Sequence, residues 1–379
     1  MQCPRSLVRK RREKRERGNR SSCSRSVPLT LQRFVSVQFS NLPLGFEHKN
    51  WPERGLAAGT LRLIGRVPKR YSTFAARNGF PSAVYRSQAT RNTVMVTLTY
   101  YPGCSLKTSS RFYEESFKAI FSFFGIEFKE LEDWSCCGAS AAHTIDELLG
   151  YALAARNLAL AELDGHHLFA PCSACYNRSM ITNTRIREDK ELREEINNAL
   201  YPLQCTGSAE VKNIIEVLHD HAGIEVVAQR TAYDLSSIRV VPYYGCVLTR
   251  IMKMEAFDDK EDPTSMDSLI WSAGAELVSW PYKMECCGAS KTLTDKDMTL
   301  KLSTRIMEMA LSLGADAIVT PCPLCQLNLD LLPYLGREGK SVPVLFLTEL
   351  LELAFFGALK GTGSHIIPVD EVVNKVKKK

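Results

Sequence analysis

From residue 95 onward, short apolar runs alternate with longer stretches of helical periodicity. MVTLTYY (95–101) and IRVVPYY (238–244) have the β-branched and aromatic character of buried strands. In the segment 110–125, four phenylalanines fall on one side of a helix, and Gly125 marks its end. Strands that alternate with helices predict parallel sheets with helices packed on their faces. The expected fold class is therefore α/β, with doubly wound, Rossmann-like parallel sheets.

The segments further along continue this alternation. IEFKEL (126–131) and HHLFA (166–170) are predicted strands, and 144–163 is a predicted helix between them. Thr144 is a plausible N-cap residue for this helix, with Glu147 completing a capping box. The second half of the chain repeats the same order of strands and helices. The pattern thus predicts two similar α/β domains in tandem.

Size and composition agree with two domains. The chain has 379 residues, of which 45% are hydrophobic and 24% are charged, as in soluble globular proteins. The most apolar run, residues 344–359, contains two glutamates and is too short to span a bilayer. We therefore predict that it is a core helix and that the chain does not span a membrane.

Charge separates the first 94 residues from the rest. Residues 1–94 contain 20 lysines and arginines, four glutamates and no aspartate, a net charge of +16, whereas the remainder carries −10. This arginine-rich segment is typical of a transit peptide, and a nucleic-acid-binding arm is a further reading. The interpretation we favour is that Met95 begins the functional protein and that the preceding segment is a mistranslated upstream region. Cys3 and Cys23 then take no part in function.

These patterns divide the chain into five parts. We expect a basic extension of low order at 1–94, a first cysteine-rich domain at 95–184 and a helical linker at 185–237. A second cysteine-rich domain at 238–360 and a lysine-rich C-terminal tail at 361–379 complete the chain. All function is expected downstream of the first part.

The strongest signal is an internal repeat of cysteines. YYPGC, SCCGAS and APCSAC in the first half correspond to YYGC, ECCGAS and TPCPLC in the second, and ten of the thirteen cysteines fall in register. In both halves, 34 residues separate the adjacent pair from the CxxC motif. The first set is Cys104, Cys136, Cys137, Cys172 and Cys175, and the second is Cys246, Cys286, Cys287, Cys322 and Cys325.

The positions of these cysteines favour bound thiolates over disulfides. A bridge between adjacent cysteines forms a strained ring, and we find no secretory signal, so a reducing, cytoplasmic setting is expected. Each cysteine lies just after a predicted strand or at the start of a helix, at the sheet edge where α/β folds bind ligands. Helix N-termini there stabilise the thiolate form that binds metals.

Two kinds of metal site are compatible with the motifs. Structural zinc takes four ligands and would leave a fifth thiol unused in each half. Thiolate-rich sites without histidine suit iron–sulfur clusters, and adjacent cysteines suit an extended cluster better than one tetrahedral ion. The consecutive spacing of ordinary ferredoxin cysteines is absent from the sequence.

With these motifs the chain resembles the B-subunit family of heterodisulfide reductases, whose members have two CCG cysteine-rich domains. The resemblance extends from Met95 to about residue 359 and includes PYYGC, WPYKMECCGAS and CPLCQLNLDL. It implies a non-cubane [4Fe–4S] cluster in each domain, held by the two cysteine sets given above. It also implies that a disulfide substrate is cleaved between the two clusters, with Cys104 and Cys246 as catalytic positions.

The resemblance also implies partners. Because the sequence has no glycine-rich dinucleotide fingerprint and no ferredoxin motif, we expect no nucleotide or flavin in this chain. Electrons would come from the two other components of such complexes, a ferredoxin-like C-subunit and a flavin-bearing A-subunit. The expected substrate is a small-molecule disulfide, namely the coenzyme M–coenzyme B heterodisulfide or an analogue, and no nucleic-acid partner is expected.

Two other classes of function stay open. Related cysteine-rich domains occur in electron-transfer or quinone-linked subunits of succinate, lactate and glycolate oxidoreductases, although one motif there is often degraded. A zinc-stabilised interaction protein is the second alternative, for which ten aligned thiols would be an unusually large number. Metal and sulfide analysis separates these readings.

Weaker signals carry smaller expectations. Gly138 and Gly288 follow the cysteine pairs and are expected to adopt positive φ or to allow close backbone approach. His143 corresponds to Leu293 in the other half, so a repeated ligand role for it is excluded. Cys205 has no counterpart and is expected to bind no metal. The tyrosines before the lone cysteines, Tyr100, Tyr101, Tyr243 and Tyr244, are expected to be core residues at strand ends, and a hydroxyl that faces a cleft is the alternative.

Overall fold

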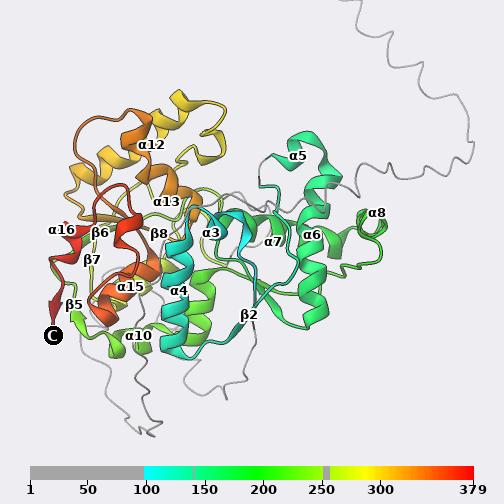
Figure 1. The fold of residues 1–379 in the computed structure, drawn as a ribbon, viewed down its shortest axis with the longest axis horizontal. Coiled ribbons are helices and arrows are strands. Elements are labelled where there is room, and N and C mark those ends of the chain that lie inside the picture. The colour runs from blue at the N-terminus through cyan, green and yellow to red at the C-terminus, as the bar shows by residue number, and fades with distance from the viewer. Residues whose placement is uncertain (1–97, 140, 251–256) are drawn as a thin grey trace, which may run out of the picture. The chain divides into compact units, whose positions relative to one another are not determined.

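The computed structural model describes residues 98–139, 141–250 and 257–379 (Figure 1). All described residues belong to one compact unit. The basic segment, Met95, and the two cysteines near the N-terminus lie outside the described residues. The expectations for them therefore stay predictions.

The first half contains a four-stranded parallel sheet. Its strand order is β2 (Phe128–Glu130), β1 (Leu98–Tyr100), β3 (His167–Phe169) and β4 (Val211–Lys212). The central strand pairs with both neighbours in register, Leu98 opposite Phe128 on one side and His167 on the other. The predicted strands at 126–131 and 166–170 are confirmed. Strand β4 comes from the segment predicted to be a helical linker.

The second half contains a sheet with the same topology. Its order is β7 (Glu276–Leu277), β6 (Arg239–Pro242), β8 (Ala317–Thr320) and β9 (Val344–Phe346), again all parallel. In each sheet the first strand along the chain is central, the next two strands flank it, and the last strand lies outside the third. The predicted α/β fold with two parallel-sheet repeats is thus confirmed.

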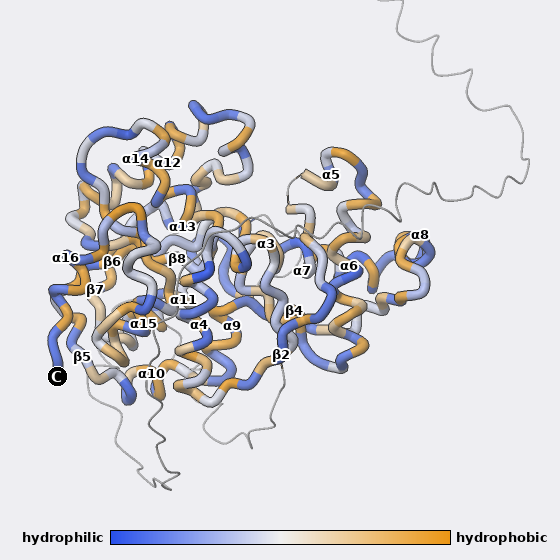
Figure 2. The backbone as a smooth tube through the Cα atoms, viewed as in Figure 1, coloured by the Kyte–Doolittle hydropathy of each residue, from blue (hydrophilic) through white to orange (hydrophobic). Residues whose placement is uncertain are grey.

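Helices connect the strands in both halves (Figure 1). The helices of the first half are α3 (Gly103–Lys107), α4 (Arg111–Phe124), α5 (Ala142–Ile145), α6 (Glu147–Asp164) and α7 (Ser173–Glu188). Those of the connecting segment are α8 (Lys190–Leu200), α9 (Ile214–Val217), the π-helical turn η1 (Leu218–Ala222) and α10 (Ile224–Arg230). Hydrophobic and hydrophilic residues are mixed along these helices (Figure 2), and α4 and α8 have a marked apolar face, as expected for helices with one side against a core.

The second half continues in the same way. Its helices are α11 (Ser265–Ser272), η2 (Ala289–Lys291), α12 (Lys296–Ser312), α13 (Pro323–Asp330), α14 (Leu332–Leu335), α15 (Leu347–Phe356), η3 (Thr362–Ser364) and α16 (Asp370–Val373). In the C-terminal segment, β10 (Lys377–Lys378) pairs with β5 (Tyr233–Asp234) in a separate antiparallel ribbon. The lysine-rich end of the chain is therefore paired with the start of the second half. No helix among the described residues is long and apolar enough to cross a membrane.

Aromatic packing fixes α4 against the first sheet. Phe117 contacts Tyr100, Phe121 and Phe169 with ring centroids 5.0–5.5 Å apart, and all four side chains are fully buried. The helix ends at Gly125, whose φ of 71° is the left-handed cap conformation that glycine adopts most easily. The predicted helix over 110–125 is confirmed by this packing.

Two local predictions were wrong in detail. The helix after the first cysteine pair is capped by Asp146, whose carboxylate accepts a hydrogen bond from the Leu149 amide at 2.7 Å, whereas Thr144 lies within the short helix α5. Aspartate is as good an N-cap residue as threonine, and periodicity alone does not distinguish them. The apolar run 344–359 is also not one helix, because it begins as strand β9 and continues as α15.

Candidate functional site

Three segments at the carboxyl edge of the first sheet carry the first set of cysteines. Cys104 lies in α3 just after β1, and Cys136 and Cys137 lie in the loop after β2. Cys172 is the N-cap residue of α7, directly after β3, and Cys175 lies in the first turn of that helix. Because these strands are parallel, all three segments leave the sheet at the same edge, as the sequence predicted.

The second set occupies the same places on the second sheet. Cys246 follows β6, and Cys286 and Cys287 follow β7 and precede the turn η2. Cys322 is the N-cap residue of α13 after β8, and Cys325 lies in its first turn. The described cysteines are all free thiols.

The five thiols of the first set form one connected group. Cys104 hydrogen-bonds to Cys136, and the Sγ atoms of Cys137 and Cys175 lie 3.5 Å apart. Cys175 also hydrogen-bonds with Cys172. A hydrogen bond from Cys136 lowers the pKa of Cys137 well below its usual range, so this buried thiol is the readiest of the set to lose its proton.

The second set is connected in the same manner. A hydrogen bond from Cys246 lowers the pKa of Cys286 to about 6, and a hydrogen bond from Cys325 lowers that of Cys322 to about 6. The Sγ atoms of Cys287 and Cys325 lie 3.7 Å apart. The pKa of a donor thiol shifts in the opposite direction, because hydrogen bonding to Cys286 raises the pKa of Cys246. In each set, therefore, some thiols give up protons easily while their neighbours hold them.

Buried tyrosines support the loops that carry the cysteine pairs. The Tyr101 hydroxyl donates to the Ser135 carbonyl at 2.7 Å, and the Tyr243 hydroxyl donates to the Glu285 carbonyl at 2.6 Å. Ser135 and Glu285 each directly precede a cysteine pair. The sequence pattern predicted a core role for these tyrosines and left open a hydroxyl that faces a cleft, but it did not predict these backbone contacts. The signal that could have revealed more is that a tyrosine stands three residues before the lone cysteine in both halves.

Glycines next to the lone cysteines bring the backbone against the CxxC motifs. Gly103 and Gly245 have φ of 62° and 71°, and a Cβ atom on either would lie only 2.9 Å from the Sγ atom of Cys175 or Cys325. A side chain at these positions would therefore meet both backbone strain and a sulfur atom. Each glycine keeps space for the second thiol of its own CxxC motif.

The glycines after the cysteine pairs behave as predicted. Gly138 and Gly288 have φ of 72° and 79°. The Gly288 amide donates to the Cys286 sulfur, with N and Sγ 3.3 Å apart, and the Gly138 amide hydrogen-bonds Cys136 in the same way. These amides therefore favour the thiolate form of the first cysteine of each pair.

Polar side chains on neighbouring helices hold each pair by its backbone. Asn157 of α6 accepts from the Ser135 amide and donates to the Ser135 carbonyl, both at 2.9 Å. In the second half, Ser303 of α12 donates to the Cys287 carbonyl at 2.7 Å, and Asn328 of α13 donates to the same carbonyl. These hydrogen bonds anchor the backbone of the loops that carry the cysteine pairs.

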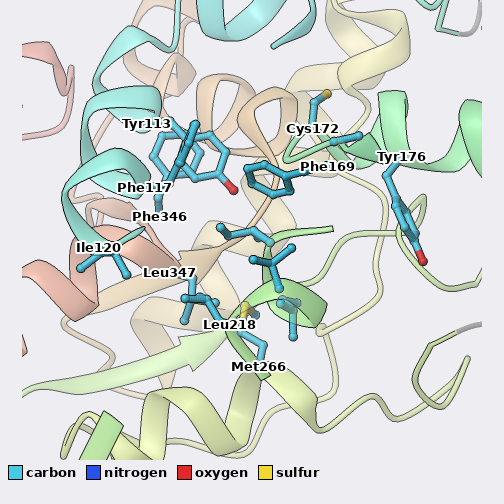
Figure 3. Packing of buried hydrophobic residues seen from close by; sticks show 14 of the residues in the cluster. Tyr113, Phe117, Ile120, Phe169, Cys172, Tyr176, Leu218, Met266, Phe346 and Leu347 are labelled. Carbon is cyan, nitrogen blue, oxygen red and sulfur yellow. The ribbon is translucent and has the colours of Figure 1, made fainter. Parts of the chain in front are cut away.

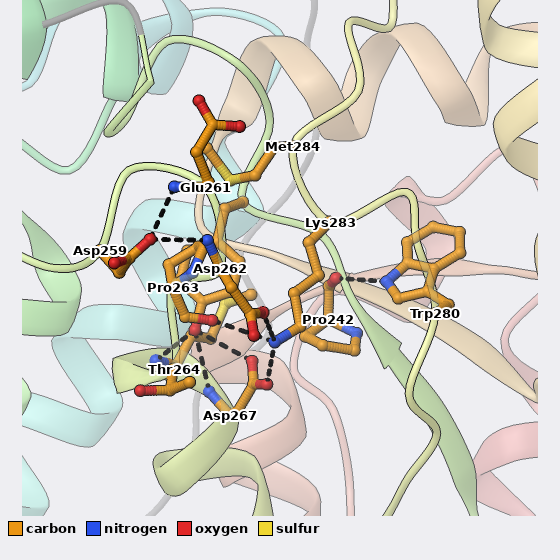
Figure 4. Close-up of polar contacts among 12 residues, drawn as sticks. Pro242, Asp259, Glu261, Asp262, Pro263, Thr264, Asp267, Trp280, Lys283 and Met284 are labelled. Atoms are coloured by element: carbon orange, nitrogen blue, oxygen red, sulfur yellow. Dashed lines mark hydrogen bonds and ion pairs between the residues drawn. The ribbon is translucent and has the colours of Figure 1, made fainter.

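A buried ion pair fixes the segment before the second pair. The Lys283 ammonium lies 2.7 Å from the Asp267 carboxylate (Figure 4). The backbone carbonyl of Lys283 accepts hydrogen bonds from the amides of Tyr244 and Gly245, at 2.9 and 3.1 Å, just before Cys246. Lys283 thus links the segment that leads to the cysteine pair with the segment that carries the lone cysteine.

Tyr113 of the first half packs against the segment of the second half that carries Cys322. Its buried ring stacks on Phe346 with centroids 3.9 Å apart, and its hydroxyl donates to the Pro321 carbonyl at 2.9 Å (Figure 3). Burial raises the pKa of Tyr113, and the nearby thiols of Cys322 and Cys172 raise it further. One side chain of the first half is thus within electrostatic reach of a thiol from each set.

Cys205 and His143, whose residue types are not repeated in the other half, lie apart from the cysteine sets. The buried Cys205 thiol contacts the Glu162 carboxylate at 3.8 Å, and burial raises its pKa to about 12. His143 packs against Gly150, where a Cβ atom would lie 2.2 Å from its Nδ1 atom. Neither side chain has a contact with the ten cysteines among its described interactions.

The donor set fits a thiolate-bound cluster better than a ready-made site for one ion. Among the described residues, no three histidine, cysteine, aspartate or glutamate side chains are arranged to hold a single metal ion. The thiols hydrogen-bond to one another instead. Metal binding therefore requires that thiols lose their protons and that the sulfur atoms move slightly apart. Five sulfur donors per set, without histidine or carboxylate, match the ligands of iron–sulfur proteins.

Comparisons with known proteins agree with this reading. The cysteine-rich domain family CCG matches residues 98–178 and 240–330. The 8-methylmenaquinol:fumarate reductase membrane anchor subunit of Wolinella succinogenes is 32% identical over 67% of this chain and 90% of that protein. The heterodisulfide reductase B-subunit-like protein of Archaeoglobus profundus is 30% identical over 74% of this chain and 98% of that protein.

Two further comparisons extend the picture. The B-subunit of the ferredoxin:CoB-CoM heterodisulfide reductase of Methanosarcina mazei is 29% identical over 69% of this chain and 89% of that protein. A solved structure of a hypothetical protein from Helicobacter pylori superimposes with a TM-score of 0.60 at 16% identity, over 72% of this chain and 52% of that one. This likeness concerns the fold alone and spans about half of the solved structure.

The fold, the two cysteine sets and these matches define a protein with two CCG cysteine-rich domains. The chain belongs to the B-subunit family of heterodisulfide reductases. Its relatives include subunits of more than one kind of oxidoreductase complex, as the fumarate reductase protein illustrates.

Proposed function

We propose that this chain is the catalytic iron–sulfur subunit of a heterodisulfide reductase-like complex. It would hold two non-cubane [4Fe–4S] clusters and reduce a disulfide, CoM-S-S-CoB or an analogue, to two thiols. The observation that carries the proposal is that both five-thiol sets are complete and that each gathers at the carboxyl edge of its own parallel sheet. A substrate that takes two electrons at one bond needs two such one-electron centres within reach.

Each set would hold one cluster through its own half of the chain. The ligands are Cys104, Cys136, Cys137, Cys172 and Cys175 for the first, and Cys246, Cys286, Cys287, Cys322 and Cys325 for the second. When bound, the clusters supply one electron each and iron that accepts the departing thiolates. Cys104 and Cys246, the lone cysteines, are the catalytic positions because each stands outside the CxxC and CCG motifs that fix the rest of its set.

The surrounding residues would bind and position the sulfur ligands. The N-termini of α7 and α13, which Cys172 and Cys322 cap, favour negative charge on the thiolates. The amides of Gly138 and Gly288 donate to sulfur, and the tyrosine and asparagine contacts hold the pairs by their backbone. Burial of Cys172, Cys175 and Cys322 limits the access of water to these thiols, whereas Cys325 is only partly buried.

The overall reaction balances as a two-electron reduction. The S–S bond breaks, two electrons and two protons enter, and two thiols leave. We infer that the electrons come from a ferredoxin-like C-subunit and a flavin-bearing A-subunit in a cytoplasmic complex. The name of the Methanosarcina mazei relative, which couples ferredoxin to heterodisulfide reduction, supports such an arrangement.

A quinone-linked electron carrier is the second candidate. The Wolinella succinogenes relative, at 32% identity, belongs to an enzyme that acts on a menaquinol and fumarate. In that reading the same two clusters would pass electrons to or from a quinone, and no disulfide would be cleaved. Both complete cysteine sets favour the disulfide reductase.

Metal analysis tests the cluster assignment. Anaerobically purified chain should contain about eight iron and eight sulfide, as two four-iron clusters require. Stoichiometric zinc without sulfide would instead support the structural-metal interpretation and rule out both electron-transfer readings.

An assay with reduced viologen and a panel of low-molecular-weight disulfides separates the two candidates. The disulfide reductase reading expects turnover, which Cys104→Ser or Cys246→Ser should each abolish and not merely halve. It also expects added thiol to perturb the cluster spectrum. Quinone reduction with no activity toward any disulfide would favour the carrier.

We further infer that all of this function lies downstream of Met95. The family match begins at residue 98, and the basic segment contributes none of the ten cysteines. A chain that starts at Met95 should take up iron to the same level as the full chain. Loss of iron on truncation would contradict the inference.

A further inference from the structure

Four ionisable side chains are buried in the second half, outside the cysteine sets. Glu349 and Glu352 are 1% exposed, Asp330 is 2% exposed, and the side chain of His365 is fully buried. His365 Nε2 lies 2.9 Å from a Glu349 carboxylate oxygen, and the Asp330 carboxylate accepts from the two amides that follow His365, at 2.8 and 3.0 Å. We call these four residues the buried acid group. Burying charge is costly, so its members must either pair or hold protons.

Glu352 is the member best suited to gain and lose a proton. It lies one turn after Glu349 on the same face of α15, and its Oε1 atom has no hydrogen-bond partner among the described residues. Burial raises the pKa of Glu352 to about 7, and the negative charge of Glu349 adds to the shift, whereas Lys360 opposes it. Lys360 is exposed, so the buried carboxyl lies within electrostatic reach of the protein surface.

The buried acid group is fixed at the sheet edge that carries Cys322. Glu349 accepts a hydrogen bond from the Phe346 amide at 2.8 Å, and Phe346 pairs in register with Thr320 of the neighbouring strand. Thr320 is two residues before Cys322. The Phe346 ring also stacks on Tyr113, whose hydroxyl donates to the carbonyl just before Cys322 (Figure 3). Because neighbouring strands lie about 4.8 Å apart, charge added at the second cysteine set acts on this group over a short distance.

The first half lacks the second acid at the corresponding position. When α9 and α15, the helices that follow the fourth strand of each sheet, are aligned at their N-cap residues, Glu216 corresponds to Glu349. Both glutamates accept a hydrogen bond from the amide of the N-cap residue. Glu352 then corresponds to His219, whose Nε2 atom lies 2.8 Å from a backbone carbonyl oxygen. The repeat therefore keeps the capping acid but not the proton-holding one.

Few other charged groups face the buried acid group. Those that do are Lys360 of the C-terminal segment and Tyr113 of α4, which is within electrostatic reach of Glu349. Strands β8 and β9, which pack against α15, contain no charged residue. On the other elements packed against α15, the charged residues with partners are Glu114 and Lys118 of α4, which pair with each other, Asp267 of α11, which pairs with Lys283, and Asp234 of β5, which accepts from the Ser236 amide.

We propose that the buried acid group is a proton store for the second cluster, in which Glu352 takes up one proton from water when a one-electron reductant reduces that cluster. This inference rests on the proposed iron–sulfur function, in which two protons accompany the two electrons that cleave the disulfide. The electron adds negative charge near a buried acid, and the proton neutralises it. Only the second half has this acid, so only the second cluster should couple its reduction to this proton.

The test is a redox titration of the full chain at several pH values, followed by electron paramagnetic resonance. Cys137→Ser, which is expected to remove the first cluster, identifies the signal of the second. At an effective dielectric constant of about 20, a unit charge about 10 Å away changes proton affinity about tenfold. The potential of the second cluster should therefore fall by about 59 mV as the pH rises through 7, the pKa of Glu352, and level off at higher pH. The potential of the first cluster should stay constant.

Variants of Glu352 give the sharper comparison. Glu352→Gln should abolish the pH dependence, whereas Glu352→Asp, which retains an acid, should keep it. Infrared difference spectra between the reduced and oxidised chains should show a protonated carboxyl group that forms on reduction and is absent from Glu352→Gln. Glu308→Gln, at an exposed position of α12, is the matched control for the loss of one charge and should retain both signatures.

The outcomes are distinct. If the clusters form but the potential of the second does not depend on pH, or depends on it equally in Glu352→Gln, the inference is wrong. It is also wrong if both clusters respond alike, because the proton then binds elsewhere. If the unchanged chain takes up no iron, the proposed function falls and the inference falls with it. Glutamine keeps the shape of glutamate, and an iron content equal to that of the unchanged chain shows that the variant is folded.

Discussion

The two cysteine sets share one frame but differ in their surroundings. In both, a tyrosine hydroxyl binds the carbonyl before the pair, and a glycine with positive φ lies against the second CxxC thiol. The differences begin beyond this frame. Cys104 and Cys136 are exposed, whereas Cys246 and Cys286 are only partly exposed. The repeat thus dictates where the thiols lie, but not how each set meets solvent.

The interface between the halves explains much of this difference. Tyr113 of α4 and Phe346 of β9 stack directly across it, and Asn177 reaches the backbone beside Cys246. Contacts of this kind need not obey the repeat, because the same surface of one half meets a different surface of the other. Duplication can therefore produce two sites with equal ligands and unequal chemistry.

The largest effect should come from the cysteine pairs. Cys137→Ser and Cys287→Ser should each remove one cluster, about four of about eight iron atoms, because each half supplies its own ligands. Iron and sulfide analysis with paramagnetic resonance measures this. If either single change empties both sites, the clusters are shared between the halves and the comparison of two separate sites fails.

Much of this frame could be predicted from the sequence, because the repeat is in the sequence. Register between the cysteines and the strand pattern predicted parallel sheets with thiols at one edge, and the glycines after the pairs predicted positive φ. The contacts of Tyr113 and Asn177 could not be predicted in this way. They join residues far apart in the chain, and no periodicity records which faces of two domains meet. Strand β4 was missed because it has only two residues within a polar segment.

Substitution of the glycines beside the lone cysteines should have equal effects at both sites. Gly103→Ala and Gly245→Ala each introduce a side chain at positive φ, at a cost of about 1–3 kcal/mol, and press it against a CxxC sulfur. The unfolding temperature and the amount of iron retained should both decrease. Gly125→Ala is the matched control, since its φ is 71° but no atom lies within 4 Å of the added Cβ. Iron loss in the control as well would mean that backbone strain, and not the sulfur contact, is responsible.

The interface also holds a titrating group on α15, the helix that packs against α4. Burial raises the pKa of Glu352 from 4.5 to about 7, with Glu349 adding to the shift. The folded chain thus keeps a proton that the unfolded chain releases, so its stabilising contribution is complete below pH 4.5 and is lost as the pH rises through 7.

The stability of the Glu352→Gln variant relative to the unchanged chain should therefore increase as the pH rises. The difference in free energy of unfolding should change by up to about 3 kcal/mol between pH 4 and 8, at about 1.36 kcal/mol per pKa unit. Denaturant unfolding of both chains across this range measures it. Glu338→Gln, at an exposed position, controls for the loss of one charge. A constant difference across the pH range would show that Glu352 is not the titrating group.

The two asparagines that hold the cysteine pairs, Asn157 and Asn328, should differ by a smaller margin in their contribution to the free energy of unfolding. Asn157→Ala removes two hydrogen bonds to the backbone of Ser135. Asn328→Ala removes three, because Asn328 donates to the Cys287 carbonyl and the Ser303 hydroxyl and accepts from the Thr292 hydroxyl. At about 1 kcal/mol per hydrogen bond, we expect a loss of about 2 kcal/mol in the first case and about 3 kcal/mol in the second. Denaturant unfolding of the two variants checks the order. A larger loss in Asn157→Ala would mean that the first pair depends more strongly on its asparagine than the second.

The smallest effect should come from Cys205. It is as buried as Cys172, Cys175 and Cys322, but it lies in the segment between the halves, and its thiol contacts Glu162 instead of another cysteine. Burial raises its pKa to about 12, which keeps it protonated and unsuited to bind metal at neutral pH. Cys205→Ser should therefore leave the iron content and the resonance signals of both clusters unchanged. The hydroxyl can keep the contact with Glu162, so the free energy of unfolding should change by less than about 1 kcal/mol. Loss of either cluster in this variant would show that burial, and not membership of the repeat, decides which cysteines hold iron.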